Sequence, residues 1–287
     1  MHSIQAKSIL SAQNGMNLCR GCVHGCIYCD SRSACYQMDH PFEDVAVKEN
    51  APRLLAQTLD RKRNLCMIGT GAMSDPYMPM PETLALTRRC LQIIADRGFG
   101  LAIQTKSDRI LRDLPLLEQI NRQAKCVVQM TLTTYDEDLC RILEPNVSTS
   151  RARFEALKIL RDHGIPTVVW ISPILPYIND TEENLRGLLS YCVEAQVKGI
   201  LCFGMGLTLR TGNREYFYEQ LDRHFPGLKA RYIREFGDSY SIPSPNQDPL
   251  MKILRETCRN HKILCDPEQV FAYLRAFPEQ MEQLSLL

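Results

Sequence analysis

Short apolar runs alternate with amphipathic segments along most of the chain. The apolar runs predict buried strands at residues 65–71, 100–105, 126–134, 165–174 and 199–206. In the segments around them, apolar residues recur at helical spacing, which predicts helices at residues 53–63, 81–97, 109–123, 150–163 and 181–196. Pro81 suits the first turn of one helix, and Gly164 suits the end of another. The pattern therefore indicates repeated strand–helix pairs.

Strands that alternate with single helices indicate βα units on a parallel sheet. The segment before residue 53 contributes one more unit, which brings the number of units to six. Six units predict an α/β fold, a partial (β/α)6 barrel of the TIM type, because a complete barrel of this type has eight. We expect residues 1–206 to form this partial barrel.

The regular alternation stops after the last of these strands. The remaining residues, 207–287, are expected to form a C-terminal cap region and tail. Their pattern predicts two helices and a loop-rich segment between them, at residues 214–225, 250–260 and 238–249, respectively. Three apolar residues share one face of the first helix, which favours a core role over a binding role: Phe217, Leu221 and Phe225.

Composition narrows the functional classes. The 287 residues are 45% hydrophobic, which is enough to bury a full core. Lys and Arg total 34 against 33 Asp and Glu, so the net charge of +1 gives no sign of bulk affinity for nucleic acid, although a local basic patch would serve. No apolar run approaches the roughly 18 residues that a membrane-spanning helix needs. Thirteen cysteines without a secretory signal indicate a reducing, cytoplasmic location.

Residues 17–35 hold five of the 13 cysteines, in the string NLCRGCVHGCIYCDSRSAC. Cys22, Cys26 and Cys29 follow the spacing C-x3-C-x2-C, with Tyr28 directly before the last of them. Glycines beside the first two cysteines let the backbone turn tightly, which thiolates need in order to converge on one metal cluster. Three thiolates predict a [4Fe–4S] cluster with one iron left open for another ligand.

Other interpretations of these cysteines fit less well. A disulfide framework is typical of small secreted domains, and nothing here resembles a secretory signal. A zinc site that adds Cys19 would have only three residues between its two C-x2-C pairs, whereas zinc ribbons have a much longer loop. A bacterial ferredoxin would read C-x2-C-x2-C-x3-C followed by Pro. The last alternative is that the cysteines are ordinary buried residues.

The C-x3-C-x2-C spacing with an aromatic residue before the third cysteine resembles the radical S-adenosylmethionine (SAM) superfamily. The wider string RGCVHGCIYCDSRSACY resembles the branch that contains spore photoproduct lyase and the DNA repair photolyase-like proteins. The resemblance implies a lyase-like enzyme with a [4Fe–4S] cluster on Cys22, Cys26 and Cys29, and S-adenosyl-L-methionine on the open iron. It implies reductive cleavage of SAM to a 5′-deoxyadenosyl radical, with electrons from a reductant such as flavodoxin or ferredoxin. It also makes DNA a candidate partner.

Ligands of α/β barrels bind at the carboxyl ends of the strands, and each predicted strand here ends in polar or glycine-rich residues. Ser74 and Asp75 offer acceptors for the SAM amino group. Lys106 offers a cation for the SAM carboxylate, and Thr131 offers a hydroxyl at the neighbouring strand end. The plainer alternatives are a capped turn, a surface lysine and a residue of high β propensity, respectively. Tyr28 is assigned to the same cofactor site.

Two positions differ from spore photoproduct lyase. In that enzyme a cysteine hydrogen donor takes the place of Ala72, and a tyrosine takes the place of Asp30. A radical relay built on those two residues cannot operate unchanged here, which disfavours repair of the spore photoproduct itself. Cys35, on the cluster loop beside Tyr36, is the candidate replacement as a catalytic hydrogen donor. The alternative is that Cys35 packs under the loop.

The sequence leaves several other residues with a structural interpretation. A fourth protein thiolate would block SAM, so we interpret Cys19 as a bystander. The scattered cysteines are expected to be small core residues: Cys66, Cys90, Cys126, Cys140, Cys192, Cys202, Cys258 and Cys265. Glu144 and Arg153 have two open interpretations, a structural pair beneath the barrel top or groups that position the substrate.

The chain ends in QLSLL at Gln283 to Leu287, which resembles the short peptide that binds the bacterial sliding clamp. The alternative is the frayed end of a helix that begins near Pro278, and a pull-down with the clamp would distinguish the two. Another class of function also stays open, an iron–sulfur electron-transfer or clamp-associated protein that never cleaves SAM. The open iron favours the enzyme, since an electron carrier would have four ligands.

Overall fold

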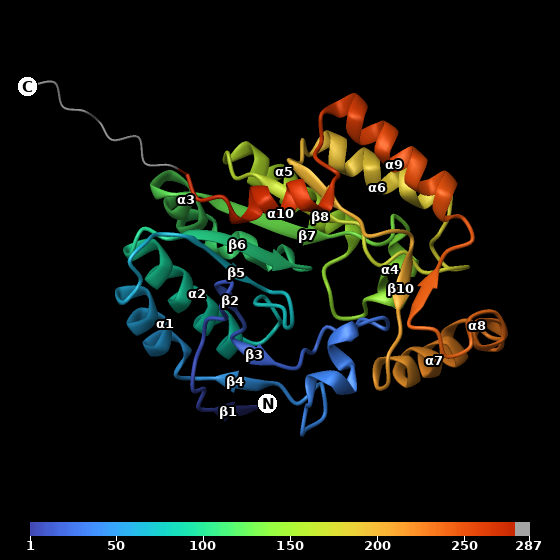
Figure 1. The fold of residues 1–287 in the computed structure, drawn as a ribbon, viewed down its shortest axis with the longest axis horizontal. Coiled ribbons are helices and arrows are strands. Elements are labelled where there is room, and N and C mark those ends of the chain that lie inside the picture. Colours follow the sequence, from blue (N-terminus) through green and yellow to red (C-terminus); the bar gives the residue numbers. More distant parts are fainter. Residues whose placement is uncertain (279–287) are drawn as a thin grey trace, which may run out of the picture.

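The computed structural model describes residues 1–278, and its centre is a six-stranded parallel sheet (Figure 1). The strands follow the order of the chain: β2 (Gly15–Met16), β5 (Met67–Thr70), β6 (Gly100–Thr105), β7 (Cys126–Thr131), β8 (Thr167–Trp170) and β9 (Gly199–Leu201). Every pairing between neighbours is parallel. This order confirms the predicted α/β partial barrel. The proposed clamp-binding peptide, residues 283–287, lies outside the described residues.

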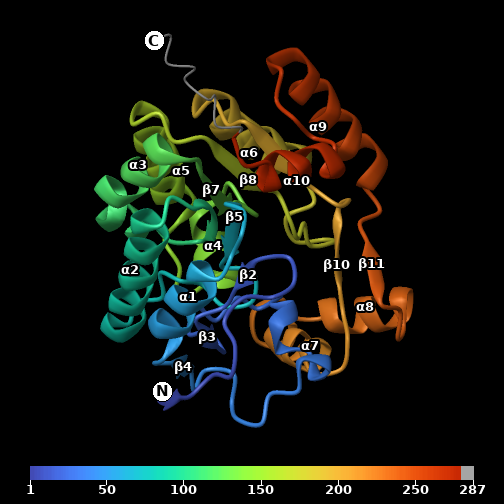
Figure 2. The same ribbon diagram turned by 60° about the vertical axis from the view of Figure 1, so that its left-hand side comes forward.

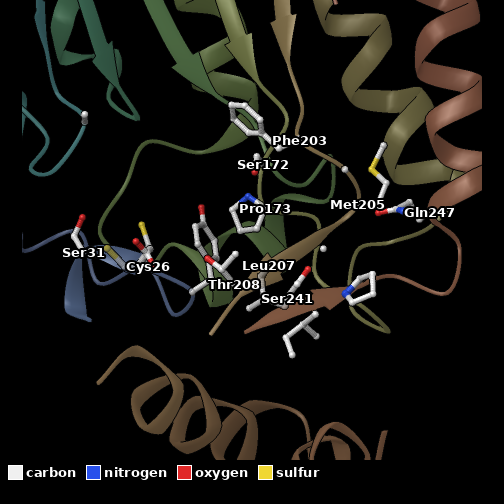
Figure 3. A pocket seen from close by; sticks show the side chains of 18 of the residues that line it. Cys26, Ser31, Ser172, Pro173, Phe203, Met205, Leu207, Thr208, Ser241 and Gln247 are labelled. Atoms are coloured by element: carbon white, nitrogen blue, oxygen red, sulfur yellow. The ribbon is translucent and has the colours of Figure 1, made fainter. Parts of the chain in front are cut away.

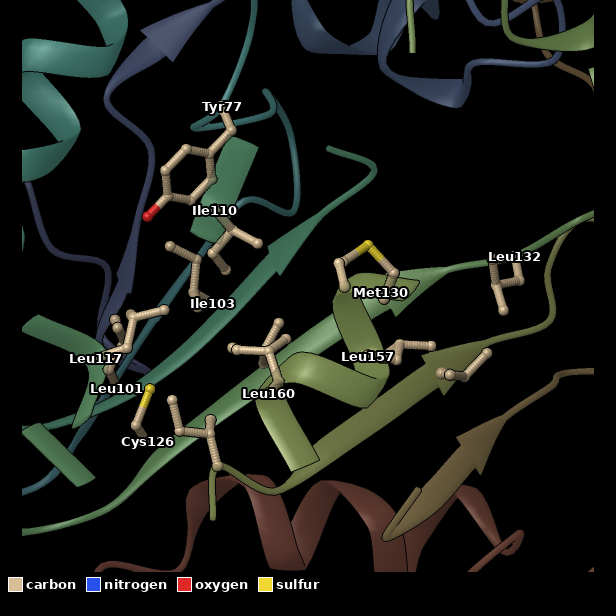
Figure 4. Close-up of a cluster of buried hydrophobic side chains, with 14 of the residues drawn as sticks. Tyr77, Leu101, Ile103, Ile110, Leu117, Cys126, Met130, Leu132, Leu157 and Leu160 are labelled. Carbon is tan, nitrogen blue, oxygen red and sulfur yellow. The ribbon is translucent and has the colours of Figure 1, made fainter. Parts of the chain in front are cut away.

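Helices cover the outer face of this sheet (Figure 2). They are α1 (Ala51–Asp60), α2 (Pro81–Asp96), α3 (Leu114–Gln123), α5 (Ser150–Asp162) and α6 (Glu182–Glu194). Side chains alternate across each strand, so one set faces these helices and the other faces the barrel interior. Leu101, Ile103 and Met130 belong to the outward set and are buried with Leu157 and Leu160 of α5 (Figure 4). This layer is the main hydrophobic core.

The predicted and observed elements differ mainly at their ends. The predicted strands at 126–134 and 165–174 stop at Thr131 and Trp170, and the residues that follow form loops at the carboxyl edge of the sheet. The predicted helix at 109–123 is divided into the 3₁₀ helix η3 (Asp108–Asp113) and α3. Pro115 lies in the first turn of α3 and has no N–H to donate, which accounts for the division.

Two smaller sheets flank the main one. The first joins β1 (His2–Ile4), β4 (Ala46–Lys48) and β3 (Cys19–Arg20). The second is an antiparallel pair, β10 (Gly206–Thr208) and β11 (Ser241–Pro243), so the predicted strand at 199–206 is split between β9 and β10. Three further helices accompany these sheets: α4 (Glu137–Leu143), α7 (Asn213–His224) and α8 (Leu228–Phe236). Phe217 and Leu221 of α7 are buried against Tyr232 of α8, and Phe225 packs at the edge of this cluster, which confirms their core role.

The last two helices return to the barrel. Helix α9 (Gln247–His261) packs beside α6 on the outside (Figure 1). Helix α10 (Pro267–Arg275) instead covers the inner face, where Val270 and Leu274 are buried against Met67, Val127 and Val168 near the amino ends of the strands. The segment after β9 therefore forms a hairpin at one end of the barrel and closes the interior at the other. The domain boundary at residue 206 stays a prediction.

Candidate functional site

The cysteine-rich loop leaves β3 at the carboxyl edge of the main sheet. Gly21 and Gly25 both have positive φ, +85° and +71°, in a region that favours glycine. A Cβ at Gly21 would lie 2.4 Å from the Phe42 carbonyl oxygen, so no other residue fits there. The N–H of Cys22 donates to that same carbonyl at 3.0 Å. The glycines thus allow the loop to fold back tightly on itself, as the sequence predicted.

The three thiols of this loop lie within electrostatic reach of one another. Cys22 and Cys26 are buried and Cys29 is half-buried. Burial, with added contributions from the charges of Asp75 and Cys29, raises the pKa of the Cys22 thiol to about 12. Burial also raises the pKa of Cys26 well above its usual value, against the opposing charge of Lys106. A metal cluster bound at such buried thiols would take the place of their protons.

Ser74 and Asp75, in the loop after β5, join this cysteine loop to the sheet. Ser74 Oγ donates to the Gly21 carbonyl at 2.6 Å. Asp75 accepts three hydrogen bonds, from the Tyr77 N–H (2.8 Å), Thr105 Oγ1 (2.7 Å) and the Lys106 N–H (2.7 Å). Both residues therefore organise the turn. A carboxylate offers about four lone-pair sites, so Asp75 retains capacity for one more donor.

His24 is a site residue that the sequence reasoning missed. Its side chain is 2% exposed and lies between Cys22 and Cys26 in the chain. Its Nδ1 is 3.5 Å from Asp75 Oδ2, while Nε2 is buried without a hydrogen-bond partner among residues 1–278. Burial, aided by the charge of Lys106, lowers the pKa of His24 and keeps the imidazole neutral. A buried polar atom without a partner beside the thiols fits a site that receives a further polar group.

Lys106 lies beside the same thiols at the end of β6. Its Nζ is 5.9 Å from the centre of the Tyr28 ring, and the side chain is half-buried. Its charge favours the ionised forms of Cys26 and Glu144. A half-buried ammonium at this position suits an anionic ligand group. Lys106 also lines the cavity described below, and its role toward the SAM carboxylate stays a prediction.

Glu144 and Arg153 form a buried ion pair behind this site, with both side chains at 0% exposure. Glu144 accepts a hydrogen bond from the Tyr28 hydroxyl, and Arg153 Nη1 donates to the Thr131 carbonyl at 2.7 Å. Burial alone would raise the pKa of Glu144, but the charges of Arg153 and Lys106 outweigh it and hold that pKa below its usual value. The pair is therefore structural, and it fixes both Tyr28 and the end of β7.

A cavity of about 460 Å³ opens next to the cysteines (Figure 3). On one side it is lined by Cys26, Tyr28, Cys29, Ala72 and Lys106. On the other side it is lined by residues that follow β8 and β9 and by the β10–β11 hairpin, including Ser172, Phe203, Met205 and Thr208. The fold thus brings the cysteine loop and the carboxyl ends of the strands to one cavity. Thr131 is buried and does not line it.

Residues 16–189 match the Radical SAM superfamily, which is more than half of the chain. The chain belongs to the radical SAM superfamily. Members are enzymes that use a [4Fe–4S] cluster and SAM, and the three converging thiols of this chain fit that cofactor pair. Within residues 1–278, no helix combines the length and apolar character needed to cross a membrane.

Curated relatives cover most of this radical SAM chain. An uncharacterized protein of Mycobacterium tuberculosis is 33% identical over 255 residues, which are 86% of this chain and 74% of the relative. An uncharacterized protein of Methanocaldococcus jannaschii is 33% identical over 181 residues, 62% of this chain and 67% of the relative. These relatives carry no assigned reaction to compare.

Solved radical SAM structures share the fold. A spore photoproduct lyase variant with bound AdoMet and dinucleoside spore photoproduct superposes with a TM-score of 0.62 at 14% identity, over 91% of this chain and 77% of the lyase. The radical SAM methyltransferase TsrM from Kitasatospora setae, with cobalamin and a [4Fe–4S] cluster bound, gives a TM-score of 0.51 at 16% identity, over 89% of this chain and 51% of TsrM. At these identities the likeness concerns the fold alone.

Two further cysteines of the radical SAM loop region lie apart from the three thiols. Cys35 is exposed and is not among the residues that line the cavity, so the interpretation that it packs under the loop is wrong. Its Sγ is 3.3 Å from Arg210 Nη1, and Arg210 also contacts Asp30, which lines the cavity. Cys19 is buried on β3, where burial raises the pKa of its thiol to about 12 against the opposing charge of Lys48.

The scattered cysteines have the expected place in the core. Six of them are buried: Cys90, Cys126, Cys140, Cys192, Cys202 and Cys258. Cys66 and Cys265 are half-buried and pack against the main core. Among the cysteines of residues 1–278, therefore, only the three of the loop are candidates for the radical SAM site.

Proposed function

We propose that this radical SAM enzyme holds its [4Fe–4S] cluster on Cys22, Cys26 and Cys29 and cleaves SAM bound at the remaining iron. The observation that carries the proposal is that three thiols lie within electrostatic reach of one another, and that two of them, with the half-buried ammonium of Lys106, line a 460 Å³ cavity. When bound and reduced, the cofactor pair supplies a 5′-deoxyadenosyl radical that takes a hydrogen atom from the substrate.

The residues around the thiols have separate tasks in this proposal. Lys106 binds the SAM carboxylate, and Asp75 uses its remaining lone-pair capacity for the SAM amino group. Ser74 holds the cysteine loop through the Gly21 carbonyl, and its remaining lone pair is the proposed second acceptor for that amino group. Thr131 is buried and does not line the cavity, so it has no direct contact with SAM in this proposal. Tyr28, held by Glu144, forms the cavity wall that keeps water from the radical.

The experiment is an anaerobic assay of the reconstituted and dithionite-reduced protein with SAM, in which 5′-deoxyadenosine is measured by chromatography. We expect Cys26→Ala to lower 5′-deoxyadenosine formation at least about 100-fold, because removing one ligand loses the site-differentiated cluster. Cys19→Ala is the matched control, since Cys19 is equally buried but lies on β3 away from the three thiols. An intact four-iron cluster that forms no 5′-deoxyadenosine would instead favour an electron-transfer protein.

We further propose that the substrate is a nucleic-acid lesion. The support is the resemblance of the string from Arg20 to Tyr36 to the DNA repair photolyase-like branch, together with the lyase fold, whose solved complex contains a dinucleoside photoproduct. Ala72 and Asp30 take the places of the cysteine and tyrosine that form the radical relay of spore photoproduct lyase. Either the lesion therefore differs from the spore photoproduct, or another residue returns the hydrogen atom to the product radical. Binding to the sliding clamp through residues 283–287 and delivery of electrons by flavodoxin or ferredoxin stay predictions.

Cys35 is the proposed hydrogen donor in this scheme. Its thiol would give a hydrogen atom to a carbon radical and become a thiyl radical that the same reductant restores. The support is that Cys35 is exposed and contacts Arg210, which in turn contacts Asp30 in the cavity lining. We expect Cys35→Ala to abolish deuterium transfer from exchangeable positions into product while 5′-deoxyadenosine formation continues. Unchanged deuterium transfer would exclude Cys35 as the donor.

A further inference from the structure

The inner face of the main sheet holds a second cavity that the SAM site does not account for. Its volume is about 300 Å³, and its lining includes Gly69, Ala72, Gln104, Gln129, Trp170 and Phe271. A Cβ built on Gly69 would meet no atom within 4 Å, so the middle of the barrel interior is open there. Ala72 lines both cavities, which places them side by side. The two cavities therefore adjoin beneath the cysteine loop.

Three aromatic rings from the linings of the two cavities contact one another. The ring of Phe203 lies 5.8 Å from Trp170 and 6.1 Å from Phe271, nearly parallel to the latter at 25°. Trp170 and Phe271 meet edge to face at 6.1 Å. Phe203 is 60% exposed, the highest value among the large hydrophobic side chains of the described residues, yet it lines the first cavity (Figure 3). The cluster therefore offers an unused aromatic face to a ligand.

Two carboxamides line the same interior. Trp170 Nε1 donates to Gln129 Oε1 at 3.0 Å, which fixes the orientation of the amide and turns its NH₂ group to other partners. Gln129 is 7% exposed, so its NH₂ group has little access to bulk water. Gln104 lies on the adjacent strand with its side chain at the same cavity. Gln129 is buried and Gln104 is half-buried, and both amides offer hydrogen-bond donors and acceptors to a polar ligand in the cavity, which a hydrocarbon ligand would not use.

We propose that Trp170, Phe203 and Phe271, with the carboxamides of Gln104 and Gln129, bind one planar heteroaromatic ring of the substrate, of the nucleobase class. Aromatic faces stack bases with roughly 1–3 kcal/mol per base, and Gln side chains pair with the donors and acceptors on base edges. Phe203 lines the same cavity as Cys26 and Cys29, so the base would be held in a space continuous with the reacting centre. The proposal names the substrate class and rests on the proposed nucleic-acid function.

Tryptophan fluorescence monitors this site directly, because Trp170 is the single tryptophan of the chain. The cluster-loaded protein is titrated anaerobically with thymidine while Trp170 fluorescence is followed. We expect a saturable change that Phe203→Ala weakens by about tenfold or more in Kd, since one stacking partner is lost. Gly69→Val, which fills the open interior without touching an aromatic residue, should weaken binding similarly. Circular dichroism verifies that both variants fold.

Tyr135→Ala is the matched control, because Tyr135 is another exposed aromatic residue, at 41%, that lines neither cavity. It should leave the Kd within twofold. Three results would overturn the proposal: no thymidine response, an unchanged Kd in Phe203→Ala, or equal binding of N-acetylphenylalaninamide. Complete displacement of thymidine by SAM alone would assign the rings to the SAM adenine and also overturn it. Because this binding assay needs no SAM cleavage, its outcome is independent of 5′-deoxyadenosine formation.

Discussion

At the scale of single residues, the buried pair of Glu144 and Arg153 predicts how the unfolding free energy of a variant changes with pH. Arg153→Met leaves a buried carboxylate without its cation, which we expect to cost about 3–5 kcal/mol of unfolding free energy at neutral pH. Glu144 has a lowered pKa in the folded protein, so its stabilising contribution exists above its unfolded pKa and is lost as pH falls through the folded value. Without Arg153, we expect burial to raise the pKa of Glu144 instead. Protonation of Glu144 then removes the free-energy cost of burying an unpaired carboxylate.

The difference in unfolding free energy between the wild type and Arg153→Met should therefore narrow from pH 7.5 to pH 5.5. Thermal unfolding at both values measures it. Arg151→Met is the control, because Arg151 forms an exposed pair with Glu155 on the same helix, and such pairs contribute roughly 0.5 kcal/mol or less. A difference that stays constant with pH would show that Arg153 acts through packing rather than through the Glu144 charge.

The spacing of cysteines and glycines identified the candidate site because both signals are local. Converging thiolates and tight turns need these residue types at short separations, so they are visible in the string of residues 17–35. His24 was missed, although it lies in the same string. A lone histidine has many uses, and only its burial against Asp75 after folding distinguishes it. Phe203 was missed for the same reason, since its exposure inside a cavity depends on three distant segments.

At the scale of elements, hydrophobic periodicity predicted the strands and helices that pack against the main core. The five later strands and the helices between them bury one face each against the same apolar layer, so their patterns are strong. Helices α4, α8 and α10 are short and bury few residues, which leaves little period to detect. Helix α10 nevertheless carried a usable signal, because Asp266 accepts from the Gln269 N–H and Pro267 occupies the first turn.

At the scale of the whole molecule, the segment after the barrel holds the cysteine loop in place. The Thr211 carbonyl accepts from the Ala34 N–H at 2.9 Å, and Arg210 reaches both Cys35 and Asp30. Gly212 makes the closest approach, since a Cβ there would lie 2.7 Å from the Arg32 carbonyl oxygen. Contacts so far apart in the chain leave no pattern in the sequence. They connect the cysteine loop to residues 210–212, which follow β10.

Gly212→Ala tests this connection. Gly212 has φ of +97°, so alanine costs about 1–2 kcal/mol in backbone strain and also clashes with the loop. Gly227→Ala is a control of similar strain, because Gly227 has φ of +85° but a Cβ there would meet nothing within 4 Å. We expect both variants to lose stability, but only Gly212→Ala to lose iron faster to a chelator. Equal rates of iron loss would mean that the loop keeps its cluster without the cap, and that the barrel alone positions the three thiols.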